Sequence, residues 1–157
     1  MFAKMRRFKQ QLTQDEIQLI LKLNTSGVLA VIDSDGYPYS VPLSYVYTNG
    51  KIYFHSAKSG HKIDAVKNCD KATFCIIDRD DVKPEKYTTY YKSVIVFGKV
   101  EIVEGEEALL AIRALGEKYY PAHDEALQAE IQKYKSAFSI ISLSIEHITG
   151  KQAKELI

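Results

Sequence analysis

Residues 55–62 of the chain, which read HSAKSGHK, place several anion-binding groups in one short stretch. Two hydroxyl groups and three basic groups stand close together there: Ser56, Lys58, Ser59, His61 and Lys62. Hydroxyl and N–H donors beside positive charge are what a phosphate group binds in proteins. The same residues also fit a capped helix with solvated lysines at a surface corner, and the stretch alone leaves both readings open.

A strand and a helix must meet at this stretch to position those groups. The segment KIYFHSA (51–57) has the alternation of a β-strand, with Tyr53 and His55 on one face and Ser56 on the other. The segment GHKIDAVKN, which follows it, predicts one or two turns of helix. The first amides of such a helix lack partners within it and carry the positive end of its dipole, so they favour a bound anion.

Hydrophobic periodicity and turn residues predict the other elements. Helices are expected over 13–24, 105–120 and 124–137, and strands over 27–33, 38–48, 51–57, 71–78, 90–104 and 138–150. The strands at 27–33, 38–48 and 51–57 are expected to form an antiparallel meander, and residues 79–89 a polar loop. This order predicts an α+β, mainly β fold, in which a sheet of about six strands rolls into a barrel with peripheral helices.

The composition narrows the class of protein. The 157 residues carry 21 basic and 20 acidic side chains, so no net charge attracts nucleic acid or an acidic membrane surface. No apolar run is long enough to cross a bilayer, and no signal core follows the basic N-terminus. We therefore expect a single domain over 1–157 in the cytoplasm, with neither nucleic acid nor a membrane as partner.

A metal site is not predicted. The candidate ligands His55, His61, Cys69 and Cys75 have spacings that match no common zinc pattern. Cys75 lies inside the apolar segment ATFCIID, which favours the role of a small core hydrophobe. The motifs GxGxxG and GxxxxGK are absent from the sequence, which removes the commonest arguments for a nucleotide site.

Several segments, taken in order, resemble one known family. The most specific are YFHSAKSGHK and YKSVIVFGK, with GVLAVID before them and ITGK near the end of the chain. They resemble the FMN-binding split-barrel proteins related to pyridoxamine 5′-phosphate oxidase, and within these the nitroimidazole-resistance (Nim-like) branch. The resemblance implies a single flavin-binding domain built as an antiparallel split β-barrel, with FMN as cofactor. It also implies a homodimer with the flavin sites at the interface.

The resemblance assigns cofactor contacts to three segments. The segment HSAKSGHK would hold the FMN phosphate and ribityl chain, which implies roles for His55, Ser56, Ala57, Lys58, Gly60, His61 and Lys62. The segment VPLS would run along the flavin ring and contact it mostly through its backbone, which implies Val41, Pro42 and Leu43. The segment YKSV would reach the flavin from the dimer partner, which implies Tyr91, Ser93 and Val94.

Two departures from the family pattern limit what the resemblance implies. Tyr39 and Ser44 stand where the oxidase itself carries basic residues, so pyridoxamine phosphate is not expected as substrate. The segment before YKSV also lacks the cysteine that Nim-like relatives often carry.

The expected function is an FMN-dependent oxidoreductase that reduces a small planar acceptor, such as a nitroaromatic or a quinone. The alternative is a non-catalytic sensor or storage protein that binds flavin or haem.

One residue is a candidate for acid–base chemistry in such an enzyme. His55 is the titratable side chain near the expected site whose charge changes close to neutral pH, so it is the candidate proton donor. It could equally serve only to orient the phosphate or ribityl chain.

Overall fold

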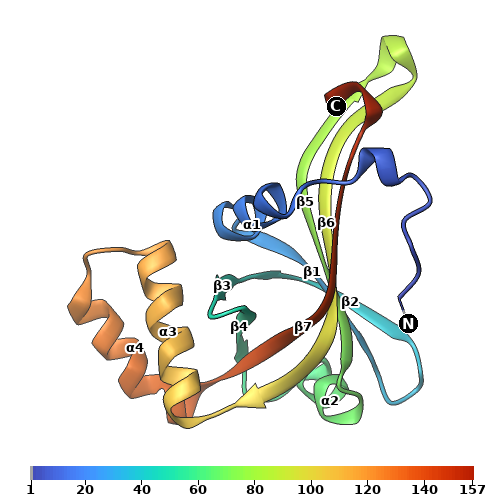
Figure 1. Ribbon diagram of the computed structural model, residues 1–157. Coiled ribbons are helices and arrows are strands. Elements are labelled where there is room, and N and C mark those ends of the chain that lie inside the picture. The colour runs from blue at the N-terminus through green and yellow to red at the C-terminus, as the bar shows by residue number, and fades with distance from the viewer. Residues whose placement is uncertain (1) are drawn as a thin grey trace.

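Seven strands form one antiparallel sheet in the computed structural model, which describes residues 2–157 (Figure 1). The strands are β1 (Ser26–Ile32), β2 (Pro38–Ser44), β3 (Val46–Thr48), β4 (Lys51–Ala57), β5 (Lys71–Lys83), β6 (Thr88–Val103) and β7 (Phe138–Gln152). Their order across the sheet is β2-β1-β5-β6-β7-β4-β3. This confirms the predicted α+β split-barrel class, with seven strands where about six were expected; Met1 lies outside the described residues.

The split in the barrel follows from the sheet order, because β2 and β3 stand at its opposite ends. The predicted meander over 27–57 was only partly right. Residues 38–44 (β2) pair with β1 and residues 46–48 (β3) pair with β4, as expected, but the middle strand is broken into two strands that stand at opposite ends of the described sheet. Tyr45 divides the strand predicted over 38–48. Its side chain is fully buried, and its hydroxyl donates to the carbonyl of Leu21 at 2.9 Å. Pro42 consequently lies on an edge strand, where its missing N–H is tolerated.

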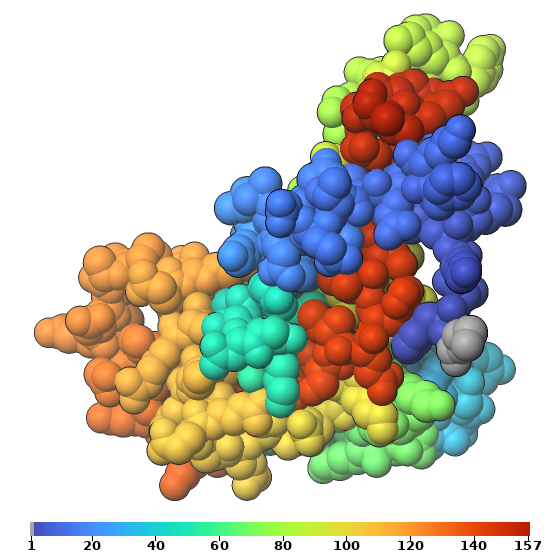
Figure 2. Space-filling model, viewed as in Figure 1, coloured from blue at the N-terminus to red at the C-terminus, as the bar shows by residue number. Residues whose placement is uncertain are grey.

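The predicted polar loop over 79–89 was also wrong. β5 and β6 continue through most of this segment as a long two-stranded hairpin, with the short 3₁₀ turn η2 (Pro84–Lys86) at its tip. Charged side chains are tolerated because both faces of the projecting ribbon meet water. Arg79 and Lys83 both pair with the carboxylate of Asp81, at 2.9 and 3.0 Å. The space-filling view shows this hairpin projecting from the body beside the C-terminal segment (Figure 2).

Four helices cover the sheet: α1 (Gln14–Leu23), α2 (His61–Asn68), α3 (Gly105–Tyr119) and α4 (Asp124–Ala137). A capping box starts α1, because Thr13 Oγ1 accepts from the N–H of Glu16 and the Glu16 carboxylate accepts from the N–H of Thr13. None of the helices in the described part of the chain is long and apolar enough to span a membrane.

Two hydrophobic clusters hold these elements together. The larger fills the barrel, where Phe54 and Phe74 meet edge to face at 5.0 Å and Ile17 of α1 closes one end. The smaller lies between the helical hairpin α3–α4 and the outer side of β4 and β7, and includes Tyr53 and Phe138. Alternate residues of β4 therefore serve two different cores, which fixes the direction in which each side chain of this strand points.

Candidate functional site

The end of β4 and the start of α2 form the corner predicted from the sequence. Ser56 points into the barrel and is buried, whereas His55 lies on the opposite face, as the alternation predicted. The His55 ring packs against Phe138, with ring centroids 4.2 Å apart. Ala57 ends the strand, and α2 begins at His61, so Lys58 and Gly60 lie in the intervening turn. The seven residues predicted to hold the phosphate and ribityl chain therefore all lie at this corner, although His55 and Ser56 face opposite sides of the strand.

The amino end of α2 is open to an anion. Gly60 is the N-cap residue, with φ of 124° and no side chain that could cap the helix. This φ lies in the region that favours glycine, so the turn depends on that residue. Since no side chain caps α2, its first amide groups remain available, together with the positive end of its dipole. The geometry fits the oxygen atoms of a phosphate group.

The three basic side chains of the corner have different surroundings. The Lys58 ammonium group donates to the carbonyl of Lys135 at the end of α4. His61 lies 3.2 Å from the Asp33 carboxylate and stacks on Tyr39 at 4.2 Å. Lys62 is half-buried and has no ion-pair partner within residues 2–157. Burial lowers the pKa of Lys62, which identifies a partly desolvated cation that an anion would stabilise.

The pKa of His55 depends on charged groups at and near this corner. Burial against the helical hairpin lowers its pKa below the ordinary histidine value. The Glu130 carboxylate raises that pKa, and the Lys62 ammonium group lowers it. The imidazole therefore gives up its proton more readily than an ordinary histidine, and an anion that neutralises Lys62 would raise its pKa. This coupling makes the protonation state of His55 sensitive to what binds beside α2.

The predicted flavin-ring segment lies on the edge strand β2. Val41 and Leu43 turn their side chains toward the barrel core, and Pro42 is exposed on the other face. Because β2 has a sheet neighbour on one side only, backbone groups along its free edge can bond to a ligand. This geometry suits the prediction that the segment acts through its backbone.

The other predicted segment, on β6, does not join the corner in the same chain. Tyr91 and Ser93 are half-buried near the projecting hairpin, whereas α2 lies at the opposite end of the sheet (Figure 1). Val94 is fully buried in the barrel core, so only its backbone could contact a ligand. A role for these residues at a flavin therefore requires a second copy of the chain, as the sequence-based prediction proposed.

A cavity of about 350 Å³ opens beside His55. Most of its wall comes from α3 and α4, and Ser44, at the end of β2, completes it. Tyr120 and His123 stack in this wall at a centroid separation of 3.5 Å. The Tyr119 hydroxyl lies 2.6 Å from the carbonyl of Thr25, which fixes the end of α3 above the sheet.

Sequence reasoning missed this cavity. Tyr119 and Tyr120, at the end of α3, both line the hollow. The hollow arises only when the two helices fold back over β4, and periodicity within one helix does not contain that information. One signal was available: Gly116 interrupts a run of good helix formers, and a Cβ there would lie 2.9 Å from Leu127 Cδ1 of α4.

Solved structures share this fold at low sequence identity. A protein from Bacteroides thetaiotaomicron VPI-5482, provisionally assigned to 5-nitroimidazole antibiotic resistance, is 21% identical, with a TM-score of 0.73 over 90% of this chain and 85% of that one. A conserved hypothetical protein from Mycobacterium tuberculosis is 19% identical, with a TM-score of 0.81 over 98% and 92%. An FAD- and haem-binding protein from Mycobacterium smegmatis is 18% identical, with a TM-score of 0.79 over 92% and 74%.

These identities are low enough that the structures bear on the fold alone. No curated protein matches the sequence at a significant level. The model of the family described as pyridoxamine 5′-phosphate oxidase, however, matches residues 13–152. That range contains every predicted cofactor residue, from Val41 on β2 to Val94 on β6. The chain belongs to the pyridoxamine 5′-phosphate oxidase family.

Proposed function

We propose that this protein binds FMN and uses it to reduce a small planar acceptor of the nitroaromatic or quinone type. The observation that carries the proposal is Lys62, a half-buried ammonium group without an ion-pair partner in residues 2–157, placed at the uncapped start of α2. Removing a cation from water is unfavourable unless an opposite charge meets it. A terminal phosphate at this corner would supply that charge.

Different residues around the corner would bind different parts of FMN. The free amides of α2 and Lys62 would hold the phosphate, and Ser56 and Ala57 would flank the ribityl chain. Backbone groups along the free edge of β2 would meet the polar edge of the ring. FMN is proposed over FAD because the corner suits a terminal phosphate. Among the structural relatives, the Mycobacterium smegmatis protein binds FAD, so both flavins belong in the binding test.

When bound, FMN supplies a ring system that accepts and releases electrons. The chain itself must then admit the acceptor, exclude water and control protons. The cavity beside His55 is lined mainly by apolar and aromatic side chains, which favour a flat aromatic molecule over a charged one. His55 stands at its wall, where its imidazole can hold or release a proton near neutral pH.

Binding is tested by spectroscopy on the purified full-length chain. We expect an oxidised-flavin spectrum, either as purified or after addition of FMN, with FMN bound more tightly than FAD. Failure to take up FMN at micromolar concentration would refute the proposal. A haem spectrum with no flavin uptake would instead support the non-catalytic haem-binding alternative.

Turnover is tested by reducing the FMN-loaded protein with dithionite and mixing it with a nitroaromatic or a quinone. We expect reoxidation faster than that of free FMN. In His55→Gln, saturated with FMN, a slower rate would support proton donation, whereas an unchanged rate with weaker FMN binding would leave His55 a positioning residue. If the wild type is no faster than free FMN, the protein is a flavin-binding protein without this activity.

A further inference from the structure

A buried carboxylate lies beside the β4–α2 corner, in the turn between β1 and β2. Asp33 is only 8% exposed, and its Oδ1 accepts from the N–H groups of Asp35 at 3.0 Å and Tyr37 at 2.8 Å. Its other oxygen, Oδ2, lies 3.2 Å from Nε2 of His61, the first residue of α2. The N–H of Tyr37, followed by that of Asp35 and by His61, lowers the pKa of Asp33, so this side chain is an anion at neutral pH.

The ring of His61 is held on two sides. Asp33 contacts one ring nitrogen, and Tyr39 of β2 stacks on the ring with centroids 4.2 Å apart and planes 16° apart. The other ring nitrogen, Nδ1, forms no hydrogen bond within residues 2–157, and the side chain is 55% exposed. His61 also follows Gly60, the N-cap residue of α2. The ring therefore stands beside the uncapped amides of α2, with Nδ1 left for a ligand.

The contact with Asp33 decides which nitrogen carries the hydrogen when the His61 ring is neutral. An ionised carboxylate only accepts, so Nε2 must donate to it. Nδ1 then holds a lone pair instead of a hydrogen, and a lone pair repels the oxygen atoms of a phosphate. Nδ1 can donate to a phosphate only after the ring takes up a proton, and the adjoining carboxylate favours that charged form.

We infer that Asp33 is a positioning residue, which holds His61 so that it binds the FMN phosphate only as an imidazolium, and that FMN binding therefore takes up a proton from solvent onto Nδ1. The inference rests on the proposed binding of FMN at this corner. Of the charged side chains around α2, Asp33 is the one that pairs with the ring within residues 2–157. The others on α2, on the β1–β2 turn and on the packed strands β1, β2 and β6 are Asp35, Lys62, Asp64, Lys67, Lys92, Lys99 and Glu101.

Isothermal titration of the full chain with FMN and with riboflavin, in two buffers of different ionisation enthalpy, counts the protons. At about pH 8 a free histidine is mostly neutral and the FMN phosphate is almost fully ionised, so the phosphate itself cannot account for proton uptake. We expect FMN to take up about one proton per chain, and riboflavin, which lacks the phosphate, to take up none. The affinity for FMN should therefore fall as the pH rises, by up to about tenfold per pH unit, while that for riboflavin stays constant.

The outcomes separate this inference from the proposed function. FMN binding without proton uptake would overturn the inference alone. No FMN binding at any pH would overturn the proposed function together with it.

Asp33→Asn tests the positioning role. Asparagine keeps an acceptor oxygen for the turn and presents an NH₂ group to Nε2, so the neutral ring would carry its hydrogen on Nδ1. This variant should still bind FMN but without proton uptake. His61→Gln should also lose the uptake, and at about pH 6 it should weaken FMN about tenfold or more with riboflavin nearly unchanged. His147→Gln, which removes a histidine of β7, is the matched control and should keep the uptake.

The proton can be located directly by nitrogen NMR of the histidine rings. At about pH 8, His61 should change from the neutral to the charged form when FMN binds. Proton uptake that persists in His61→Gln would assign the proton to another group, such as His55 or Lys62, and overturn the inference.

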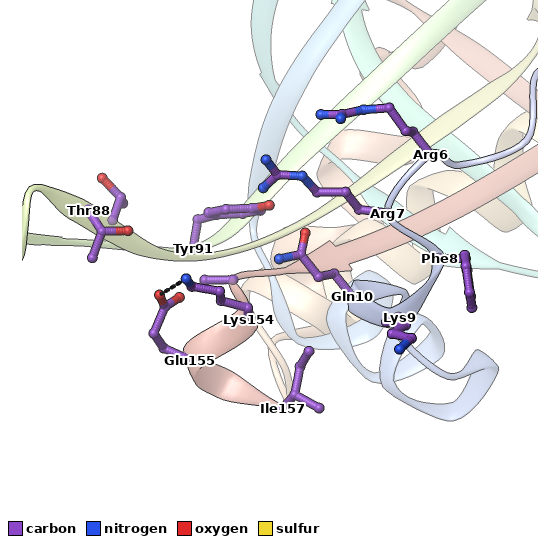
Figure 3. A pocket seen from close by; sticks show the side chains of 12 residues that line it. Arg6, Arg7, Phe8, Lys9, Gln10, Thr88, Tyr91, Lys154, Glu155 and Ile157 are labelled. Atoms are coloured by element: carbon purple, nitrogen blue, oxygen red, sulfur yellow. Dashed lines mark ion pairs between the residues drawn. The ribbon is translucent and has the colours of Figure 1, made fainter.

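A competing position for the phosphate is the basic pocket at the base of the β5–β6 hairpin. Arg6, Arg7 and Tyr91 line it (Figure 3), and Tyr91 is predicted to reach the flavin of the partner copy. The preference for FMN over riboflavin should depend on His61. If Arg7→Ala abolishes that preference and His61→Gln keeps it, the phosphate meets the partner's pocket instead, and the inference is overturned.

Discussion

Lys62 and Lys67 lie on the same short helix but in different surroundings. Lys62 is half-buried in the first turn, whereas Lys67 is exposed in the last turn. If Lys62 meets a phosphate, Lys62→Ala should weaken FMN by about tenfold or more, because a charge-assisted hydrogen bond contributes about 1.5–3 kcal/mol. Riboflavin, which lacks the phosphate, should lose much less, and Lys67→Ala should change neither affinity. Fluorescence titration of the wild type and of both variants with each ligand measures this, and equal losses for both ligands would remove Lys62 from the phosphate site.

His55 gives a second test at the residue scale that needs no cofactor. NMR titration of its imidazole should give a pKa below the usual histidine value, since burial disfavours the charged ring. Lys62→Ala should raise this pKa and Glu130→Gln should lower it further. Because the folded-state pKa is depressed, unfolding binds a proton as the pH falls through about 6.5, so this residue removes stability toward acid. A pKa that neither variant shifts would show that His55 is not coupled to these groups.

Sequence reasoning at this scale succeeded where the chemistry is local. The residue types of 55–62 and the alternation of β4 were enough to place an anion-friendly corner. They could not show that Lys58 bonds to the end of α4, or that His61 pairs with Asp33. Both partners come from distant parts of the chain. The difference between Lys62, which has no ion-pair partner within residues 2–157, and Lys58 and His61, which have partners, therefore arises only when the chain folds.

At the scale of single elements, β6 has an irregular pairing with β7 that depends on one glycine. The pairing of β6 with β7 shifts register between Phe97 and Gly98, and a Cβ at Gly98 would lie 1.9 Å from the carbonyl oxygen of Ser144. Gly98→Ala should therefore destabilise the protein by about 1–3 kcal/mol, because backbone must move. Urea unfolding monitored by circular dichroism measures the loss.

Gly116→Ala is the matched control for this strand. Its Cβ would meet only the end of the Leu127 side chain, which can rotate away. Alanine also favours a helix over glycine by about 1 kcal/mol, so this variant should be neutral or more stable. If the two variants lose the same free energy of unfolding, the close approach of β6 to β7 is not what makes Gly98 necessary.

Local sequence patterns were sufficient to predict helix limits, but they were not sufficient to predict which strands pair. The capping box at Thr13 and the proposed limits of α4 were readable because caps and amphipathic stripes are short-range patterns. The arrangement of strands was not readable in the same way. Strands β2 and β3 are consecutive in sequence but stand at opposite ends of the sheet, since buried Tyr45 turns the chain between them. Pairing partners are set by the closed core, which no local pattern encodes.

At the scale of the whole molecule, the outer face of the sheet carries a continuous apolar row. The pairings align Pro42, Val28, Cys75 and Ile95 across four neighbouring strands. Cys75 was expected in the core, but it is only half-buried and lies on this outer row; burial raises the pKa of its thiol. Ile77, on the same face of β5, is 61% exposed. An apolar row over adjoining strands is typical of a surface that another protein chain covers.

The family resemblance implies a homodimer in which Tyr91 and Ser93 of one copy reach the flavin of the other, and we propose that this face forms its interface. We therefore expect the FMN-loaded wild type to sediment as a dimer at micromolar concentration. Ile95→Glu places a charge within the apolar row and should shift the protein toward monomer, because burying an unpaired carboxylate is unfavourable. The same variant should bind FMN at least about tenfold more weakly, since each site would lose the contacts supplied by its partner. Leu19→Glu, at an exposed position on α1, is the control and should keep both the dimer and the affinity. A wild-type monomer that holds FMN tightly would show that one chain completes the site alone.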